Sequence, residues 1–124
     1  MAASTLERST VDRQSIIDLV RKYLVAVARQ GIPVSFGVLF GSQATGNTHQ
    51  WSDIDLVVVS PSFDGKRRFG DSAPLWHVAT DVDTRIEPIG VGERQWIEDD
   101  ASAIIEIARR TGVVITPEPE AVPA

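Results

Sequence analysis

The sequence predicts an α/β fold, with a small mixed β-sheet and helices packed on one side of it. Apolar residues recur at helical spacing between about Val11 and Gln30, whereas the segments 34–40 and 53–59 are apolar and have the length of strands. The chain has 124 residues, of which 43% are hydrophobic and 23% are charged. This is the size and composition of one globular domain with its own core.

The composition also excludes several functions. The chain contains no cysteine, and therefore neither a disulfide framework nor a thiolate metal site. No apolar run approaches the roughly 18 residues of a membrane span, and the N-terminus lacks the apolar core of a signal peptide. We therefore expect a cytoplasmic protein with no membrane partner. The net charge of −5 argues against strong non-specific binding to nucleic acid.

Three parts are expected along the chain. Residues 1–9 are small and polar, which predicts a flexible N-terminus. Residues 10–116 hold the folded domain, whose first helix packs its apolar stripe on the sheet. Residues 117–124 are rich in proline and predict a disordered tail.

The first predicted strand, 34–40, ends in Gly41 and Ser42. Glycine at a strand end permits a close backbone approach and unusual dihedral angles. A helical turn over residues 43–45 would add its amide groups to the Ser42 hydroxyl and form a small anion site. Because Gly-Ser is also a common turn, a functional interpretation depends on the residues downstream of it.

Two carboxylates open the second strand, after a gap of ten residues. Side chains alternate along a strand, so Asp53 and Asp55 point to one face and Ile54 to the other. Two carboxylates on one face of an apolar strand repel each other and resist desolvation. A solvent-exposed strand start explains one such acid but poorly explains two. The pair predicts a site for a divalent metal that carries the phosphates of a nucleotide.

These residues resemble a known signature. The stretches 41–46 (Gly-Ser-Gln-Ala-Thr-Gly) and 52–56 (Ser-Asp-Ile-Asp-Leu) are similar to the motif of the nucleotidyltransferase superfamily related to DNA polymerase beta. The pattern is most similar to that of the minimal nucleotidyltransferases, small domains often paired with a HEPN-domain protein, as in the antitoxins of HEPN/MNT systems. The resemblance implies a palm-like nucleotidyltransferase core over residues 10–116.

The resemblance also implies a third acid on a later strand. The segment 84–89 has the pattern of that strand, and the acidic-aromatic segment after it resembles the helix start found there in the family. Counting back places Glu87 at the acid position, with Asp83 and Asp81 as alternatives just outside the strand. Pro88 removes a backbone donor, which predicts a strand at the edge of the sheet.

The resemblance further implies the roles of these residues. Asp53, Asp55 and Glu87 would hold two magnesium ions, and Glu87 would also accept a proton from an attacking hydroxyl group. The Gly41 amide and the Ser42 hydroxyl would hold the departing pyrophosphate. The reaction would transfer a nucleoside monophosphate, AMP from ATP, to a hydroxyl acceptor.

A basic loop, a tryptophan and two histidines remain. Lys66 and Arg67 lie in a loop that is either merely solvated or a flap whose charges bind the triphosphate. Trp76 is expected in the core. His49 and His77 have no catalytic partner nearby in the sequence, and we expect structural or solvent-exposed roles for both.

Two further helices are expected, over 72–78 and 99–110, with a short strand after them over 113–115. The apolar side of the second of these helices would consist of Ile104, Ile105 and Ala108.

The acceptor is the part of the reaction that depends on the resemblance alone. The resemblance implies that the acceptor is a tyrosine of a HEPN toxin, and that this protein is the antitoxin. Gln43 and Thr45 stand where many members of the family carry arginine, which predicts weaker nucleotide binding. Two alternatives stay open: a catalytically weak or inactive antitoxin that acts by contact with its partner, and a domain that senses nucleotide without turnover.

Overall fold

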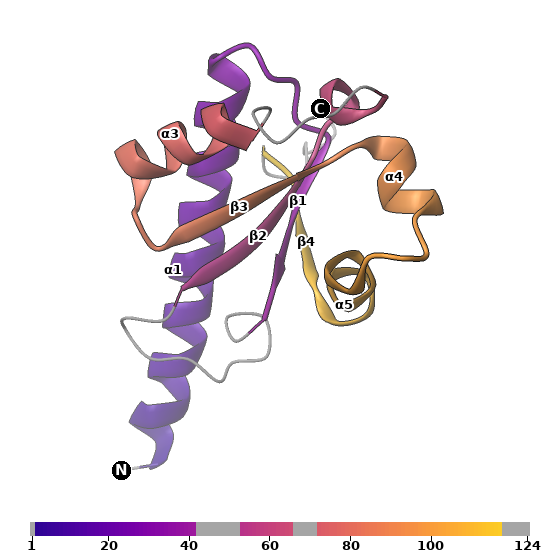
Figure 1. Cartoon of the computed structure of the whole chain (residues 1–124). Helices are drawn as coiled ribbons and strands as arrows, with labels where there is room; N and C mark the ends of the chain where they lie inside the picture. The colour runs from indigo at the N-terminus through magenta and orange to yellow at the C-terminus, as the bar shows by residue number, and fades with distance from the viewer. Residues whose placement is uncertain (1, 42–52, 66–71, 118–124) are drawn as a thin grey trace, which may run out of the picture.

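The computed structural model describes residues 2–41, 53–65 and 72–117, with side chains from residue 13 onward. Figure 1 shows the order of the elements. They are α1 (Ala2–Arg29), β1 (Phe36–Phe40), β2 (Ile54–Val59), the short 3-10 helix η1 (Pro61–Phe63), α3 (Ala73–Val82), β3 (Ile86–Val91), α4 (Glu93–Glu98), α5 (Ala103–Thr111) and β4 (Val113–Ile115).

The described strands form one mixed sheet in the order β3-β2-β1-β4. β1 pairs antiparallel with both β2 and β4. β2 pairs parallel with β3, and α3 forms the crossover that a parallel pair requires. The mixed sheet, the central place of the 53–59 strand and the edge position of the strand that contains Pro88 are all confirmed.

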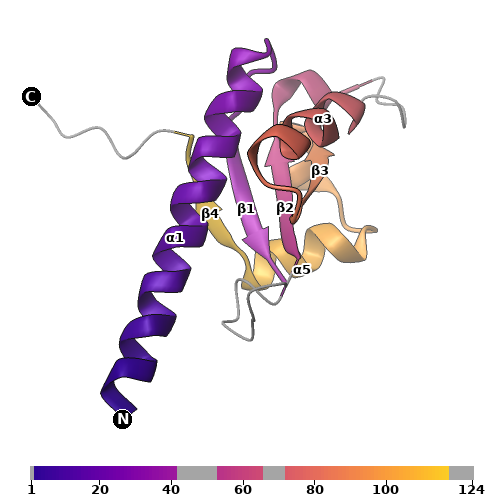
Figure 2. The same ribbon diagram turned by 90° about the vertical axis from the view of Figure 1, so that its left-hand side faces the viewer.

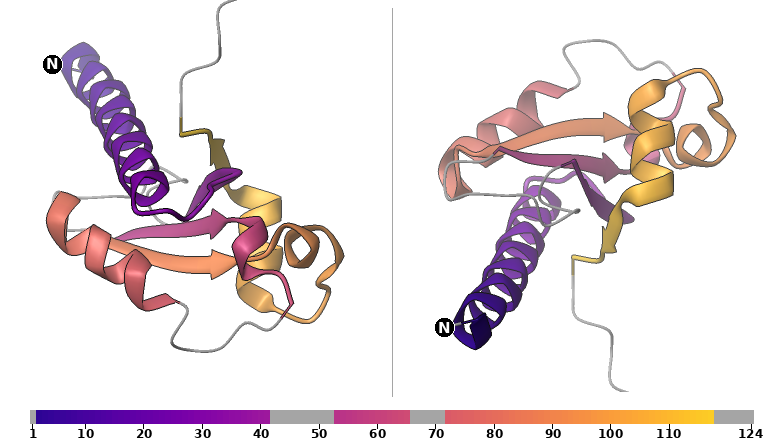
Figure 3. Two further views of the ribbon diagram at one scale, coloured as in Figure 1. Left: turned by 90° about the horizontal axis from the view of Figure 1, so that it is seen from above. Right: turned by 90° about the horizontal axis from the view of Figure 1, so that it is seen from below.

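Helices cover both faces of the sheet, not one face as the sequence predicted. α1 and α3 pack on one face, over Leu56 and Val58 of β2. α5, together with Trp96 of α4, packs on the other face, over Val57 and Val59. Figure 3 shows the two groups of helices on either side of the strands. Because β2 is apolar on both faces, each face needs its own cover.

The first helix is longer than predicted. It begins at Ala2, whereas the sequence predicted a start near Val11 after a flexible segment, 1–9. The additional turns contain neither proline nor glycine and include several good helix formers, so nothing in the sequence interrupts the helix. Figure 2 shows α1 crossing the sheet and extending beyond it towards the N-terminus.

The helix predicted over 99–110 begins later than expected, as α5, because Asp99 organises a turn between α4 and α5. Its Oδ1 atom accepts hydrogen bonds from the backbone N–H groups of Ala101 and Ser102, at 2.9 and 2.8 Å. Ser102 then caps α5 by accepting a hydrogen bond from the N–H of Ile105 at 3.3 Å. The sequence therefore located the end of α5 at Gly112 but not its start.

Two residues expected in the core are exposed. Trp76 is 47% exposed, since α3 turns Leu75 and Val78 to the core instead. Ile104 is 43% exposed, because the buried side of α5 is formed by Ile105 and Ala108, which were both predicted. Within the described residues, no helix is both long enough and apolar enough to cross a membrane.

A buried hydrogen bond joins α1 to α3. The hydroxyl of Tyr23, which is fully buried, donates to the backbone carbonyl of Leu75 at 2.8 Å. Burial raises the pKa of the Tyr23 hydroxyl above its usual range, so the group remains a donor. The two helices that cover this face of the sheet are thereby fixed to each other by a polar contact as well as by apolar packing.

We expect the Tyr23→Phe substitution to lower the free energy of unfolding by about 1 kcal/mol, the net value of one hydrogen bond. Urea denaturation followed by circular dichroism would measure the change. The control is Thr80→Val, which removes an exposed hydroxyl that donates to the carbonyl of Trp76 and should change the free energy by less than about 0.5 kcal/mol. Equal stability of Tyr23→Phe and wild type would contradict the expectation.

Candidate active site

The paired aspartates lie where β2 begins. Asp55 is the second residue of β2 and is partly buried, and Asp53 directly precedes the strand and is exposed. By the alternation along β2, Asp55 shares a face with Val57 and Val59, which lie under α4 and α5. The carboxylates therefore continue the apolar row of that face beyond the part that the helices bury.

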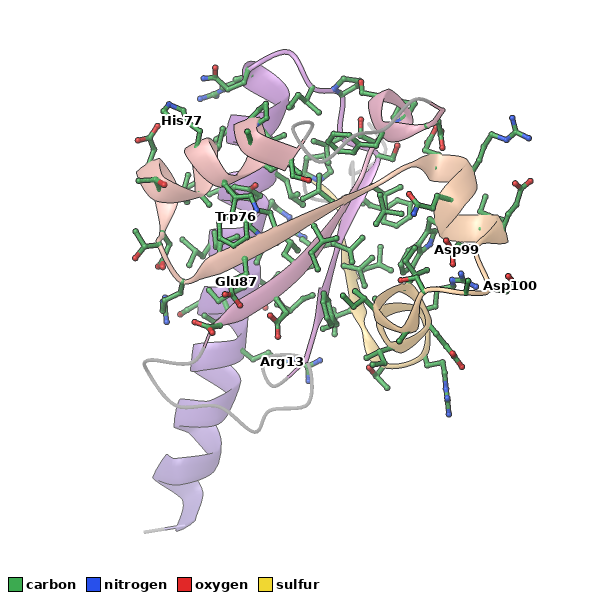
Figure 4. The ribbon with its side chains drawn as sticks, viewed as in Figure 1. Arg13, Trp76, His77, Glu87, Asp99 and Asp100 are labelled. Carbon is green, nitrogen blue, oxygen red and sulfur yellow. The ribbon has the colours of Figure 1, made fainter. Side chains whose placement is uncertain are left out.

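Glu87 lies opposite Asp55 on the neighbouring strand. In the parallel pairing of β2 with β3, Asp55 is aligned with Glu87, just as Ile54 is aligned with Ile86. Figure 4 shows Glu87 in the first part of β3, where β3 runs beside the start of β2. Adjacent strands are separated by roughly 4.8 Å, so the register brings Glu87 close to Asp55, which is two residues after Asp53.

The electrostatics agree with this proximity. Burial raises the pKa of Glu87 above its usual range, and the negative charges of Asp53 and Asp55 raise it further, as do hydrogen bonds with both carboxyl groups. The three groups are thus close enough to share protons in the absence of a cation. Such a cluster stabilises positive charge placed between its members.

These acids do not, however, form a ready-made metal site. Within residues 2–41, 53–65 and 72–117, no group of three or more His, Cys, Asp or Glu side chains is already arranged to hold a metal ion. The interaction that raises the pKa of Glu87 nevertheless shows that the three carboxyl groups are close to one another.

Gly41 lies beside the acids of β2 and β3, in the turn that follows β1. It comes directly after β1, whose last residue, Phe40, is aligned with Asp55. Its φ angle is +74°, and a Cβ atom at this position would lie 2.5 Å from Oδ2 of Asp55. The turn therefore requires glycine at position 41 for two reasons. The backbone is left-handed there, and the Asp55 carboxylate occupies the space that a side chain would need. The sequence predicted a close approach here but not that its partner is Asp55.

Asp83 and Asp81, the alternative third acids, lie elsewhere. Asp81 is exposed on α3. Asp83 ends α3 and forms an ion pair with Arg85, whose hydrogen bond lowers the pKa of the Asp83 carboxyl. Neither acid contributes to the pKa of Glu87. The sequence offered one signal for the ion pair, the Asp-x-Arg spacing, which is too common to be diagnostic.

Other predicted site residues fall outside the described part of the chain. These are Ser42, Gln43, Thr45, His49, Lys66 and Arg67. His77 is exposed on α3, and Figure 4 shows it well away from Glu87.

A model of the nucleotidyltransferase domain family matches residues 20–111, which include Gly41, Asp53, Asp55 and Glu87. The chain belongs to this family. The nucleotidyltransferase domain thus covers most of the sequence, from the middle of α1 to the end of α5.

A solved structure supports the fold of this nucleotidyltransferase domain. It is the crystal structure of a candidate nucleotidyltransferase from Sulfolobus solfataricus, with a TM-score of 0.61 and 16% sequence identity. The match covers 86% of this chain and 84% of that one. A comparison with curated proteins finds no match. At this identity the likeness concerns the fold alone.

We expect the Gly41→Ala substitution to destabilise the protein more than Gly31→Ala. Both glycines have positive φ, but a Cβ atom at Gly31 would meet nothing within 4 Å. Gly31→Ala should therefore cost about 1 kcal/mol of backbone strain. Gly41→Ala should cost at least about 1 kcal/mol more, because the added methyl group overlaps the Asp55 carboxylate. Urea denaturation would compare the two variants, and equal losses would show that Asp55 does not crowd this turn.

We expect the Glu87→Gln substitution to stabilise the metal-free protein at neutral pH. The pKa of Glu87 in the folded state lies above its ordinary value of 4.5, so the ionised side chain disfavours folding at higher pH. The gain should disappear as the pH falls below about 4.5, where the carboxyl is protonated in both states. Denaturation at pH 7.5 and pH 4 in the presence of a chelator would measure it.

The control for this experiment is Glu98→Gln, which removes the same charge from the exposed end of α4. It should have little effect at either pH. A Glu87→Gln variant less stable than wild type at neutral pH would contradict the crowding of the three carboxylates.

Proposed function

We propose that this nucleotidyltransferase domain is a metal-dependent enzyme that transfers AMP from ATP to a hydroxyl group. The observation that carries the proposal is the alignment of Asp55 with Glu87 on adjacent parallel strands, beside a turn at Gly41 that makes room for the Asp55 carboxylate. A purely structural role leaves the cost of this carboxylate cluster unexplained.

The donor set supports magnesium as the cation. Carboxylate oxygens are the ligands that Mg²⁺ prefers, and Asp53, Asp55 and Glu87 would supply them from two adjacent strands. Asp53 is exposed and Asp55 is only partly buried, so both retain access to solvent and to a nucleotide. Two bound divalent ions would stabilise the entering and leaving oxygens of an in-line displacement.

The residues of the chain would position the reactants and move one proton. The acceptor oxygen forms a bond to the α-phosphorus as the bond from that phosphorus to the pyrophosphate oxygen breaks. Glu87 would take the proton of the acceptor hydroxyl as general base, from its place opposite Asp55. The Gly41 amide would face the departing pyrophosphate, with Ser42, Lys66 and Arg67 as further candidate contacts.

A tyrosine hydroxyl of a HEPN toxin is the acceptor that we propose, and its modification would make this protein an antitoxin. The similarity of residues 41–46 and 52–56 to the minimal nucleotidyltransferases supports this part of the proposal. The acceptor would approach the face of the sheet that carries Asp55 and Glu87, beyond the part covered by α5.

The test is transfer of label from α-labelled ATP, with Mg²⁺, to a HEPN-type partner protein. We expect the Asp53→Asn/Asp55→Asn variant to lose roughly 100-fold or more of the rate, because the cations contribute several kcal/mol of charge stabilisation. The matched control is Asp81→Asn, an exposed acid on α3 that should retain the wild-type rate. Omitting Mg²⁺ or adding a chelator should abolish transfer in wild type.

Two results would contradict the proposal. Transfer at the wild-type rate by the double variant would remove these acids from the chemistry. A double variant that transfers no label but still neutralises the toxin would instead favour inhibition by contact.

A further inference from the structure

The helix α5 has an exposed apolar flank. Ile105 and Ala108 face the sheet and are buried, whereas Ile104 and Ile107 are 43% and 49% exposed. Residues three apart are neighbours on the surface of a helix, so these two isoleucines form one continuous apolar surface. We call this surface, Ile104 and Ile107, the α5 flank.

One end of the sheet carries the acids, and the other end lies beside α4. Phe40, the last residue of β1, is aligned with Asp55, whereas Phe36 is the first residue of β1. The ring of Trp96, in α4, meets the ring of Phe36 edge to face, with 5.9 Å between the ring centroids. The contact between α4 and β1 is therefore at the opposite end of β1 from Asp55.

The α5 flank is turned towards the end with the acids. On the other side of α5, the Arg109 guanidinium lies 6.0 Å from the centroid of the Trp96 ring and donates a hydrogen bond to the backbone carbonyl of Asp99. Successive residues of a helix are rotated by about 100°, so both isoleucines lie on the side of α5 away from Arg109. Because α5 packs on the face of the sheet that carries Asp55, its flank borders the acid end of that face. Figure 4 shows Asp99 well away from Glu87.

The charges near the α5 flank restrict what can bind there. Asp53, Asp55 and Glu87 place negative charge at that end of the sheet, and the whole chain has a net charge of −5. On the solvent side of α5, Glu106 and Arg110 form an ion pair with each other at 3.5 Å. The α5 flank is thus an uncharged apolar surface next to concentrated negative charge, which repels an acidic partner and favours a basic one.

We propose that the α5 flank is the docking surface for the protein that carries the acceptor hydroxyl. That protein presents aliphatic or aromatic side chains to Ile104 and Ile107, and basic residues towards the acids. The inference rests on the proposed function, because the acceptor has to approach the face that carries Asp55 and Glu87. Burial of apolar surface supplies affinity for the acceptor protein, whereas the acids act on the nucleotide. Docking and transfer therefore depend on different residues.

The variant Ile104→Gln/Ile107→Gln separates docking from transfer. Glutamine forms helices at least as well as isoleucine, so α5 should fold. The assay is transfer of AMP from α-labelled ATP to a HEPN-type partner protein at varied concentrations of the partner. We expect KM for the partner to rise about tenfold, because the apolar area of two side chains is no longer buried on docking. The values of kcat and of KM for ATP should stay within about twofold of wild type.

The matched control is Ile97→Gln. Ile97 is 74% exposed on α4, the helix that contacts the other end of β1, so its substitution should leave KM for the partner within about twofold of wild type. Should the double variant fail to fold by circular dichroism, Ile107→Gln alone replaces it and should raise KM for the partner about threefold.

Calorimetry measures docking without transfer. The HEPN-type partner is titrated into the Asp53→Asn/Asp55→Asn variant, with and without the two glutamine substitutions, and the substitutions should weaken binding about tenfold. Binding of the partner to wild type should weaken in high salt, because basic residues of the partner lie near the acids.

Three results would overturn the inference. They are an unchanged KM for the partner in the glutamine variants, an equal rise in Ile97→Gln, and partner binding to wild type that does not change with salt. Self-association of the protein in sedimentation experiments that is lost in Ile104→Gln/Ile107→Gln would also overturn it, because a second copy of this chain would then occupy the α5 flank.

Failure of the proposed function gives a different result. Wild-type protein that binds the partner through Ile104 and Ile107 but transfers no label would overturn the proposed function and leave the docking surface. Transfer that requires Asp53 and Asp55 but not the two isoleucines would overturn the docking surface alone.

Discussion

Parallel pairing of β2 with β3 is the constraint on which the site depends. The two strands are joined through η1 and α3, and their register aligns Asp55 with Glu87. A shift of one residue would turn Glu87 to the face covered by α1 and α3 and place Ile86 or Pro88 beside Asp55. The cluster therefore exists only in this register, and the apolar residues on both strands specify the register.

Burial on both faces of the sheet offsets the unfavourable charge at its end. Val57 and Val59 lie under α4 and α5, and Leu56 and Val58 lie under α1 and α3. These contacts fix β2 along most of its length. The carboxylates that begin the strand repel one another, as the raised pKa of Glu87 indicates. Packing on both faces holds the strands in place despite this repulsion, and carboxyl groups with perturbed pKa values are typical of functional sites.

The sequence predicted correctly those features that depend on residues close together in the chain. Helical spacing predicted α1, the Asp-x-Asp spacing selected Asp53 and Asp55, and Pro88 indicated an edge strand. It was wrong about the start of α1 and the exposure of Trp76. Helix propensity differs little between neighbouring residues, so it does not locate the first residue of a helix sharply. One apolar residue on a short helix says little about which way the helix is turned.

The sequence by itself determined the elements and their chemistry: a helix, apolar strands, a glycine turn and two acids with their side chains on one face. These arise from properties of neighbouring residues, namely period, propensity and the alternation of a strand. Only the tertiary structure decided that helices cover both faces, that Asp55 occupies the space next to Gly41, and that Asp83 forms an ion pair with Arg85. The first two arise between segments distant in the chain, and the third depends on side-chain geometry at a turn, so none of them is encoded in local periodicity.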